Sequence, residues 1–478
     1  MLYSKRKVSV IHDGNEQMNV RKKVTALKPV QLIVLSFVAV IFTGACLLML
    51  PISNQDGNWF SFIDALFTAT SATCVTGLVV VPTATQFTLF GQIVIILLIQ
   101  IGGLGLVSIV AVIIVLTSKK LMQSEKIAIT EAVNADSQFQ IGRFLKFIIA
   151  FVFLTELVGA VLLAIRFVPM MGVAQGIYQA VFTSISAFCN AGFDILGTNS
   201  LALFSKDWFL SIIVSSLIIF GGLGFGVWAD LYKHIRAFFK KEESIIKAKK
   251  AIRIHTKLVI KATLFLLVLG TVLYFLSEYN NPLTLGTYSL PDKIVASFFQ
   301  SATLRTAGFY TIDFGDTHLF TKLFSSILMF IGGSPGGTAG GIKTTTFMVL
   351  ILLIISEVKG RKDLVFSKRT ISKETIQRCF SILTLALMFF LAGILILSLT
   401  EQADLIDIVF EVASALGTVG LTTGLTPLLT WVGKLVILLL MFIGRIGPIA
   451  VVLSLAFRNN KHQSKNDITY PDAHILVG

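Results

Sequence analysis

The chain has 478 residues, of which 55% are hydrophobic and only 14% are charged, and its mean hydropathy is +0.83. A soluble globular protein carries about a quarter charged residues, and a disordered chain needs low hydrophobicity, so both classes are excluded. A spanning helix needs about 20 apolar residues, which leaves room for roughly eight to ten spans. The composition therefore predicts an all-α integral membrane protein.

The placement of charge predicts the topology. A net charge of +14 would suggest nucleic-acid binding if it formed a patch on a soluble fold. Instead, 32 of the 40 Lys and Arg lie in five stretches, namely 1–29, 119–146, 233–261, 359–378 and the tail from 458. Polar stretches between them, such as 51–87 and 400–433, contain acids and no base. Because basic loops stay inside, we expect a cell-membrane protein with both termini cytoplasmic and no nucleic-acid partner.

Eight apolar runs are candidate spans, five without charge and three with one charge each. In chain order they are Val30–Leu50, Leu89–Ser118, Phe147–Ile165 (with Glu156), Trp208–Ala229, Ala262–Ser277, Leu323–Ile355 (with Lys343), Cys379–Thr400 and Leu435–Phe457 (with Arg445). The first run is too long for a signal peptide and lacks a small-residue cleavage site, so we expect it to be retained. Between the two runs of each pair lies an apolar stretch of about a dozen residues, which is too short to span. Such a stretch is typical of a re-entrant helix.

These four short stretches are copies of one another. They read FIDALFTATSATCVTGL (62–78), IYQAVFTSISAFCNAGF (177–193), IVASFFQSATLRTAGFY (294–310) and DIVFEVASALGTVGLTT (407–423). The glycines Gly77, Gly192, Gly308 and Gly420 are separated by 115, 116 and 112 residues. Ten positions before them stand Phe67, Phe182, Phe298 and Phe410. Such a near-constant period indicates an internal repeat.

The second run of each unit carries a glycine cluster. The clusters are IGGLG (101–105), FGGLGFG (220–226), IGGSPGGTAGG (331–341) and IGRIG (443–447). Glycine in a span commonly allows close helix packing, but one cluster per unit favours a bend or narrow place near the membrane centre. We therefore predict four span–pore helix–span repeats around a pseudo-fourfold pore. The predicted boundaries are 30–118, 119–232, 233–356 and 357–457, between a cytoplasmic extension (1–29) and a cytoplasmic tail (458–478).

Four similar units can close around an axis at which their glycine-bearing loops meet. A ring of backbone carbonyls can replace the water shell of a cation. Each short helix precedes its loop, so its partially negative end faces inward and favours a cation. The acids Asp64, Asp194, Asp313, Asp316 and Asp407 lie outward, where they either concentrate cations at the mouth or are simply solvated loop residues.

The segments TCVTGL, FCNAGF, LRTAGF and GTVGLT, on this four-unit plan, resemble the Trk/Ktr/HKT superfamily, most closely its Ktr-type ion-translocating subunits. The resemblance covers the chain from Pro29 to the tail and implies uptake of K⁺ through four single-glycine filter loops. Having glycine in all four loops resembles the potassium-selective members. The implied filter residues are Val75, Thr76 and Gly77; Asn190, Ala191 and Gly192; Thr306, Ala307 and Gly308; and Thr418, Val419 and Gly420.

The cluster of the third unit predicts a gate. A helix cannot contain Pro335 among so many glycines without unwinding. The nearby GIKT does not match a phosphate-binding loop, because Ile342 separates the glycine from Lys343. In the family this position is an intramembrane gating loop, here Gly332, Gly333, Ser334, Pro335, Gly336, Gly337, Thr338, Ala339, Gly340 and Gly341.

Three ionisable residues are expected at membrane depth, where such groups are functional candidates. Arg445 replaces a glycine of its cluster, so it should face the central cavity, where its donor fork could hold the gate-loop carbonyls. The family places a basic residue here; a structural tie between spans is the alternative for Arg445 and for Lys343. For Glu156, a basic partner and a transport role are equally open.

Two other classes of function find little support. The six histidines are scattered and none lies in H-E-x-x-H spacing, and there is no nucleophile elbow, so we do not expect an enzyme. A coupled secondary transporter would have two structural halves rather than four equal units. Within the family, channel and Na⁺-coupled or Na⁺-stimulated transport both stay open.

The partners are implied by the resemblance. Ktr-type subunits form membrane homodimers and pair with a cytosolic RCK-type ring that binds nucleotides. The stretch 233–261 and the tail are the available contact surfaces, although anionic lipid headgroups would attract the same basic residues. We expect K⁺ as the transported ion, Na⁺ as a candidate activator or coupling ion, and no organic cofactor on this chain.

Overall fold

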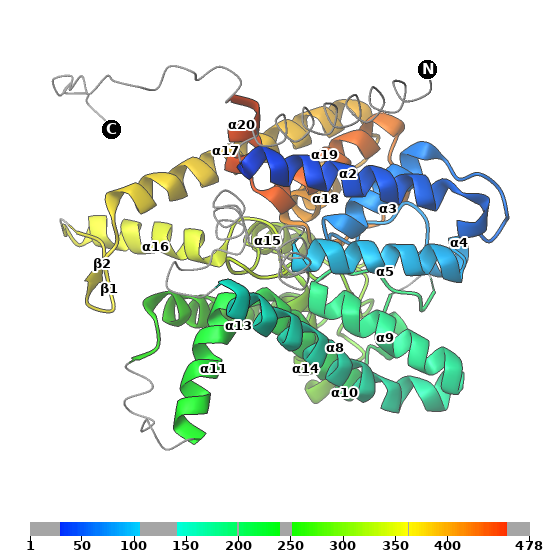
Figure 1. The fold of residues 1–478 in the computed structure, drawn as a ribbon, viewed down its shortest axis with the longest axis horizontal. Helices are drawn as coiled ribbons and strands as arrows, with labels where there is room; N and C mark the ends of the chain where they lie inside the picture. Colours follow the sequence, from blue (N-terminus) through cyan, green and yellow to red (C-terminus); the bar gives the residue numbers. More distant parts are fainter. Residues whose placement is uncertain (1–28, 106–140, 198–199, 240–250, 362, 457–478) are drawn as a thin grey trace, which may run out of the picture.

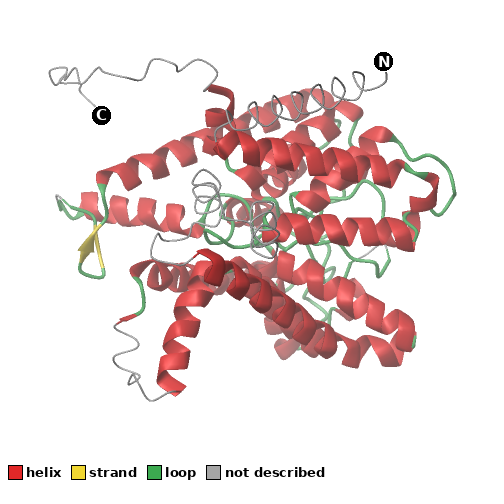
Figure 2. Cartoon of the chain, in the orientation of Figure 1, coloured by secondary structure: helices red, strands yellow, loops and turns green. Residues whose placement is uncertain are grey.

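The computed structural model describes residues 29–105, 141–197, 200–239, 251–361 and 363–456. The predicted N-terminal extension up to residue 28, the tail and most of the basic stretch 119–146 therefore lie outside the described residues. Within these ranges the protein is helical, and its only strands form the hairpin of β1 (Val365–Phe366) and β2 (Arg369–Thr370) (Figure 2). The first and last described helices lie side by side, so the chain closes on itself (Figure 1).

Each predicted unit opens with a long helix. These helices are α2 (Pro29–Met49), α8 (Ile141–Met171), α13 (Ile254–Glu278) and α17 (Lys373–Thr400). By length and composition, α8, α13 and α17 can cross a membrane. Large apolar side chains such as Leu154 on α8 and Leu399 on α17 are exposed on their outer faces. Extended apolar surfaces of this kind are typical of contact with lipid.

A shorter, mostly buried helix follows in each unit. These are α3 (Phe62–Thr73), α9 (Val173–Cys189), α14 (Leu290–Thr303) and α18 (Leu405–Gly417). Asp64, Asp292 and Asp407 lie in the first turns of α3, α14 and α18. An acid at this end interacts favourably with the positive end of the helix dipole. The other end of each helix leads into one of the four glycine-bearing loops.

The last helix is described only in part in the first unit and is interrupted in the other three. The pieces are α5 (Leu89–Leu104), α10 (Trp208–Gly222) with α11 (Phe225–Phe239), α15 (Leu319–Phe330) with α16 (Thr344–Val358), and α19 (Trp431–Ile446) with α20 (Pro448–Ala456). Two of these pairs bend by 99° at their break. The predicted runs 208–229, 323–355 and 435–457 are thus not continuous helices. Glycines with positive φ, Gly224 and Gly447, stand at the two bends, a conformation that a right-handed helix cannot contain.

Short helical turns complete the connections on the side that the charge pattern predicts to face outward, which we call the outer side. They are η1 (Pro51–Ser53), α4 (Thr83–Gln86), η2 (Ala202–Phe204) and η3 (Thr426–Leu428). The predicted run Leu89–Ser118 is described only as far as Gly105, which has φ 76° and ends α5. The part of that run from residue 106 onward lies outside the described residues.

Side-chain contacts join each unit to the next at the outer rim. Every contact runs from the beginning of a second helix to the beginning of the following short helix. They are Gln92 Oε1 with Tyr178 Oη (3.0 Å), Trp208 Nε1 with Asp292 Oδ1 (2.7 Å), Lys322 Nζ with Asp407 Oδ1 (3.0 Å) and Lys434 Nζ with Asp64 Oδ1 (2.6 Å). The fourth contact joins the last unit to the first and completes a closed ring of units.

The contact that closes this ring can be tested by a double-mutant cycle. Asp64 and Lys434 are about four-fifths buried, so the pair is less screened than a surface ion pair. We expect Asp64→Asn and Lys434→Met each to lower the thermal unfolding temperature in detergent, with a coupling of about 1 kcal/mol between them. Additive effects of the two substitutions would show that the ion pair does not stabilise the ring.

Candidate functional site

Each short helix ends by turning one residue into the left-handed conformation. The residues are Val75 (φ 57°), Asn190 (φ 61°), Thr306 (φ 70°) and Thr418 (φ 51°), each two positions before the predicted glycine. Asparagine adopts this conformation readily, whereas the other three are β-branched and therefore strained in it. The reversal stops the helix and presents the following carbonyls away from it, at the centre of the protein.

The structure brings the four predicted glycines together in a closed ring. A Cβ atom added to Gly77 would lie 2.5 Å from the carbonyl oxygen of Ala191, in the next unit. A Cβ atom added to Gly192 would lie 2.8 Å from the carbonyl oxygen of Ala307. One added to Gly308 would lie 2.6 Å from the carbonyl oxygen of Val419. One added to Gly420 would contact the carbonyl oxygen of Thr76, in the first unit, so the four contacts close a ring. All four glycines have positive φ. We call these residues the glycine ring.

One predicted equivalence between the units is wrong. Phe67, Phe182 and Phe410 are fully buried, but in the third unit the fully buried residue is Phe299, and Phe298 is partly exposed. In the third unit the buried phenylalanine stands nine positions before its glycine rather than ten, so the helix is shifted by one position relative to that glycine. A count backwards from the glycine therefore selects the wrong phenylalanine.

A cavity of about 360 Å³ lies on the outer side of the glycine ring and is lined by all four of its glycines. Asp194 and Asp313 line the same cavity. Of the acids expected to concentrate cations at the mouth, these two are in position to do so. Asp64 and Asp407 are instead paired with lysines of the neighbouring units, so their charges are neutralised.

The half-buried Asp194 lies in the loop that follows Gly192. Its carboxylate accepts a hydrogen bond from the backbone N–H of Leu196 (3.1 Å). Burial nevertheless dominates and raises the pKa of Asp194 to about 6. Burial, with the charges of Asp313 and Asp194, also raises the pKa of Tyr310, another residue of this cavity, to about 12.

The predicted gate residues, Gly332–Gly341, form an irregular segment on the opposite side of the glycine ring. Gly340 adjoins the side chain of Thr418, which precedes the ring, whereas the outer cavity is lined by residues that follow it. We call this stretch the glycine-rich segment. Its two ends are held together, because the N–H of Gly332 donates to the carbonyl of Ile342 (2.9 Å).

The glycine-rich segment is hydrogen-bonded to the broken helix of the second unit. The N–H groups of Ser334 and Thr338 donate to the carbonyls of Gly222 (2.9 Å) and Gly221 (3.2 Å). In return, the N–H of Phe225, the first residue of α11, donates to the carbonyl of Gly336 (2.9 Å). The break between α10 and α11 thus leaves backbone groups free for the segment to bind.

Both predicted basic residues contact the glycine-rich segment. Arg445 donates from one guanidinium nitrogen to the carbonyl of Thr338 and from the other to the carbonyl of Gly102. It therefore joins the segment to the first unit, as a planar fork of donors allows. Lys343 donates to the carbonyl of Ala339 (2.7 Å), within the segment itself.

Glu156 is buried behind the second loop and has no basic partner in the described part of the chain. Its two carboxylate oxygens accept hydrogen bonds from the amide of Gln100 (3.1 and 3.2 Å). The thiol of Cys189, the last residue of α9, lies 3.8 Å away. Of the two alternatives for Glu156, the basic partner is not found in the described residues, where an amide and a thiol contact the carboxylate instead.

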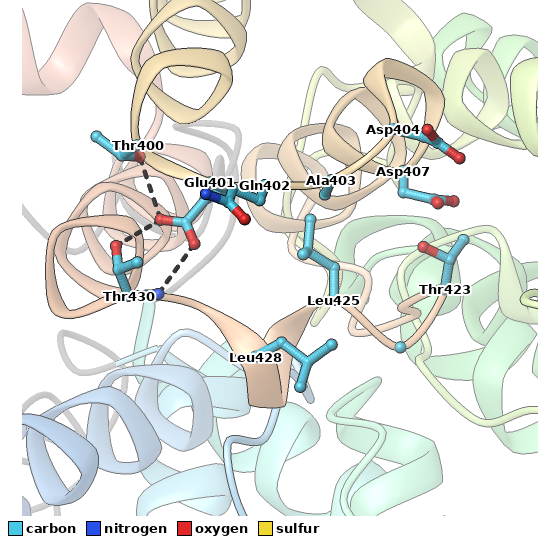
Figure 3. Close-up of a pocket in the computed structure, with 11 residues that line it drawn as sticks. Thr400, Glu401, Gln402, Ala403, Asp404, Asp407, Thr423, Leu425, Leu428 and Thr430 are labelled. Carbon is cyan, nitrogen blue, oxygen red and sulfur yellow. Dashed lines mark hydrogen bonds between the residues drawn. The ribbon is translucent and has the colours of Figure 1, made fainter.

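A second cavity, of about 460 Å³, lies at the outer end of the fourth unit (Figure 3). Glu401, at the end of α17, accepts from the N–H (3.0 Å) and the hydroxyl (2.6 Å) of Thr430 and from the hydroxyl of Thr400 (3.1 Å). These bonds fix the beginning of α19 to the end of α17 (Figure 3). We assign Glu401 a structural role, because its carboxylate is satisfied by these donors.

The sequence reasoning missed four buried hydroxyl groups that contact the loops. They belong to Ser71, Ser186, Thr303 and Ser414, near the ends of the four short helices. A signal was present, since a serine stands six residues before the glycine in three of the four segments. It was obscured in the third unit, where the hydroxyl belongs to a threonine that stands five residues before the glycine instead of six.

Comparisons with known proteins agree on one family. The family model TrkH, described as cation transport protein, matches residues 10–466. The chain is 42% identical over 450 residues to Ktr system potassium uptake protein B of Bacillus subtilis, which covers 94% of this chain and 97% of that protein. It is 40% identical to potassium/sodium uptake protein NtpJ of Enterococcus hirae, over 96% of this chain and 98% of that protein.

A solved structure also matches. The potassium transporter TrkH of Vibrio parahaemolyticus aligns with a TM-score of 0.69 at 20% sequence identity, over 88% of this chain and 83% of that one. At this identity the match shows a shared fold.

The raised pKa of Asp194 predicts a pH dependence. A carboxyl group with a pKa of about 6 is charged above that pH and neutral below it, so the outer cavity loses negative charge as the external pH falls through 6. We expect cation uptake into vesicles, at subsaturating cation, to fall several-fold in that range. Asp194→Asn should flatten this dependence, whereas Asp56→Asn, on the exposed outer surface, should keep it. An unchanged pH profile in Asp194→Asn would contradict the assignment.

Proposed function

This chain belongs to the TrkH family of cation transport proteins, and we propose that it is the potassium-translocating membrane subunit of a Ktr-type uptake system. It is a transport protein rather than an enzyme. The curated relatives named above carry potassium uptake in their names, and they match nearly the full length of the chain. The proposal goes further than the family, because it assigns the path of the ion to particular residues.

The closed glycine ring is the observation that carries this proposal. The carbonyls of Thr76, Ala191, Ala307 and Val419 each adjoin a glycine of the neighbouring unit. We assign these carbonyls, with those of the three-residue sets ending at each glycine, as the selectivity filter. They would replace the water shell of K⁺ without any acidic side chain at the narrowest point. The negative ends of the four short helices point toward the same place and favour a cation.

The glycine-rich segment is our candidate for the gate. It lies on the inner side of the glycine ring and is bound to the second unit and, through Arg445, to the first. In the closed state that we propose, Arg445 and Lys343 hold the carbonyls of Thr338 and Ala339 and keep the segment across the path. Opening then requires these hydrogen bonds to break, so that the segment can leave the path.

The remaining parts of the proposal concern the assembly. We propose a multi-pass cell-membrane protein with cytoplasmic termini and four repeats at 30–118, 119–232, 233–356 and 357–457. A homodimer would bind a nucleotide-binding RCK-type ring through the basic inner surfaces, which also attract anionic lipids. Because one relative is named for potassium and sodium, external Na⁺ is a candidate activator, to be tested by adding it to a potassium flux assay.

The filter assignment is tested by ion flux through the purified chain in liposomes. Gly77 has φ 99° and no room for a Cβ beside Ala191 O, so Gly77→Ser should displace the carbonyl ring. We expect the ratio of Na⁺ to K⁺ flux to rise about tenfold, which corresponds to about 1.4 kcal/mol of lost discrimination. Gly57→Ser is the matched control, because Gly57 also has positive φ but has open space around it. An unchanged ratio in folded Gly77→Ser would refute the filter assignment.

The gate assignment predicts a change in rate without a change in selectivity. Arg445→Ala removes the hydrogen bonds that join the segment at Thr338 to the first unit at Gly102, and shortening 332–341 removes the segment itself. Both should raise K⁺ flux several-fold in the absence of a partner, with the Na⁺ to K⁺ ratio unchanged. The K⁺ flux of Arg445→Lys should be intermediate, because the single ammonium group of lysine cannot bind both carbonyls as the planar guanidinium does. A change confined to selectivity would place Arg445 at the filter instead.

A further inference from the structure

Four buried residues near the ends of the short helices each contact the following loop twice. They are Ser71 on α3, Ser186 on α9, Thr303 on α14 and Ser414 on α18, all with no exposed surface. Their backbone carbonyls accept from the N–H groups of Thr76 (2.8 Å), Ala191 (2.8 Å), Ala307 (3.0 Å) and Val419 (2.8 Å). In every unit, the N–H held in this way belongs to the residue whose own carbonyl adjoins the glycine ring.

The side-chain hydroxyls of the same four residues make the second contact. Ser71 Oγ accepts from the N–H of Gly77, and Ser414 Oγ accepts from the N–H of Gly420, both at 3.1 Å. In the second and third units the hydroxyl is the donor instead. Ser186 Oγ donates to the carbonyl of Phe193 (2.6 Å), and Thr303 Oγ1 donates to the carbonyl of Phe309. Both carbonyls belong to the residue directly after the glycine.

The third unit shows that this contact follows position in space rather than position in the sequence. In each of the other units the serine that contacts the loop is followed by an alanine, and in the third unit Ser301 is the serine with this neighbour. The hydroxyl of Ser301 nevertheless donates to Leu267 O in α13 (2.8 Å). Thr303, which stands five residues before its glycine instead of six, makes the contact with the loop in its place. A hydroxyl thus stands at this point in all four units, although the register differs.

We propose that these four hydroxyls are positioning residues for ion selectivity, an inference that rests on the proposed function of the loops as a filter. A small ion is bound tightly only if the carbonyls move inward toward it. The loops could follow such an ion only by breaking their bonds to the helices behind them. Because the hydroxyls hold each loop at or next to its glycine, they oppose this inward movement and maintain a ring suited to the larger ion.

The two kinds of contact are not equivalent. Removing the hydroxyl of Ser71 or Ser414 leaves the N–H of a ring glycine buried without a partner. Removing that of Ser186 or Thr303 leaves a carbonyl, and unpaired carbonyls are tolerated better in protein interiors than unpaired N–H groups. The first and fourth units should therefore be the more sensitive to loss of the hydroxyl.

The experiment compares Na⁺ and K⁺ flux in liposomes for variants of Ser71. We expect Ser71→Ala to raise the Na⁺ to K⁺ flux ratio about tenfold, and Ser186→Ala to raise it less. Ser71→Thr should restore the ratio, since Thr303 provides the hydroxyl in the third unit. Thr70→Val is the matched control, because Thr70 is equally buried on the same helix but its hydroxyl donates only to Leu66 O within that helix (2.7 Å).

Three results would overturn the inference. One is an unchanged Na⁺ to K⁺ ratio in folded Ser71→Ala while Gly77→Ser still raises the ratio. This result would leave the filter assignment intact. Another is an equal change in Thr70→Val, which would indicate a general packing effect. The third is a failure of Ser71→Thr to restore the ratio. If Ser71→Ala does not fold, Ser414→Ala provides the same measurement. If neither Gly77→Ser nor Ser71→Ala changes the ratio, the proposed function itself fails.

Discussion

The structure depends on one backbone constraint, which is that four buried helices must end around a common point and present the carbonyls of the loops that follow them to that point. Each helix achieves this by placing one residue in the left-handed conformation, and three of these residues are β-branched. Such a conformation costs about 1–2 kcal/mol per residue. The cost is tolerated because every loop is completely enclosed, with its N–H groups bound to the helix it has just left. Strain and enclosure together give a ring of carbonyls that does not depend on flexible side chains.

The four units are alike around this ring and unlike beneath it. The second helix is interrupted in the second, third and fourth units, and within the described residues only the third unit has a long segment, Gly332–Gly341, at its interruption. The fourth unit contributes Arg445 at a place where the other clusters have glycine, and the second contributes the backbone carbonyls of Gly221 and Gly222. A repeated architecture therefore holds one asymmetric segment, which the second unit binds through its backbone and the fourth through Arg445.

Much of this arrangement could be predicted from the sequence, because the repeat is written in short local motifs. The periodic glycines located the loops. The position of Arg445 in a glycine cluster predicted that it lies near the carbonyls of the glycine-rich segment. That Phe299 rather than Phe298 is the buried equivalent of Phe67 could not be predicted, since counting back from the glycine assumes the same spacing in every unit. Nor could the ion pair of Asp64 with Lys434, which requires the closed ring of units. The amide partner of Glu156 was equally inaccessible, because Gln100 lies in another unit.

The ion pair of Asp64 with Lys434 also has a consequence for biosynthesis. Its partners are 370 residues apart in the sequence, so it belongs to the most non-local contacts of the chain. Contacts of this kind form late, because a long stretch of chain must be ordered first. The other three joints can assemble one after another as the units leave the ribosome. The ring of units is thus closed only when the fourth unit arrives, and a chain that ends before that unit would leave Asp64 without its lysine partner and the ring open.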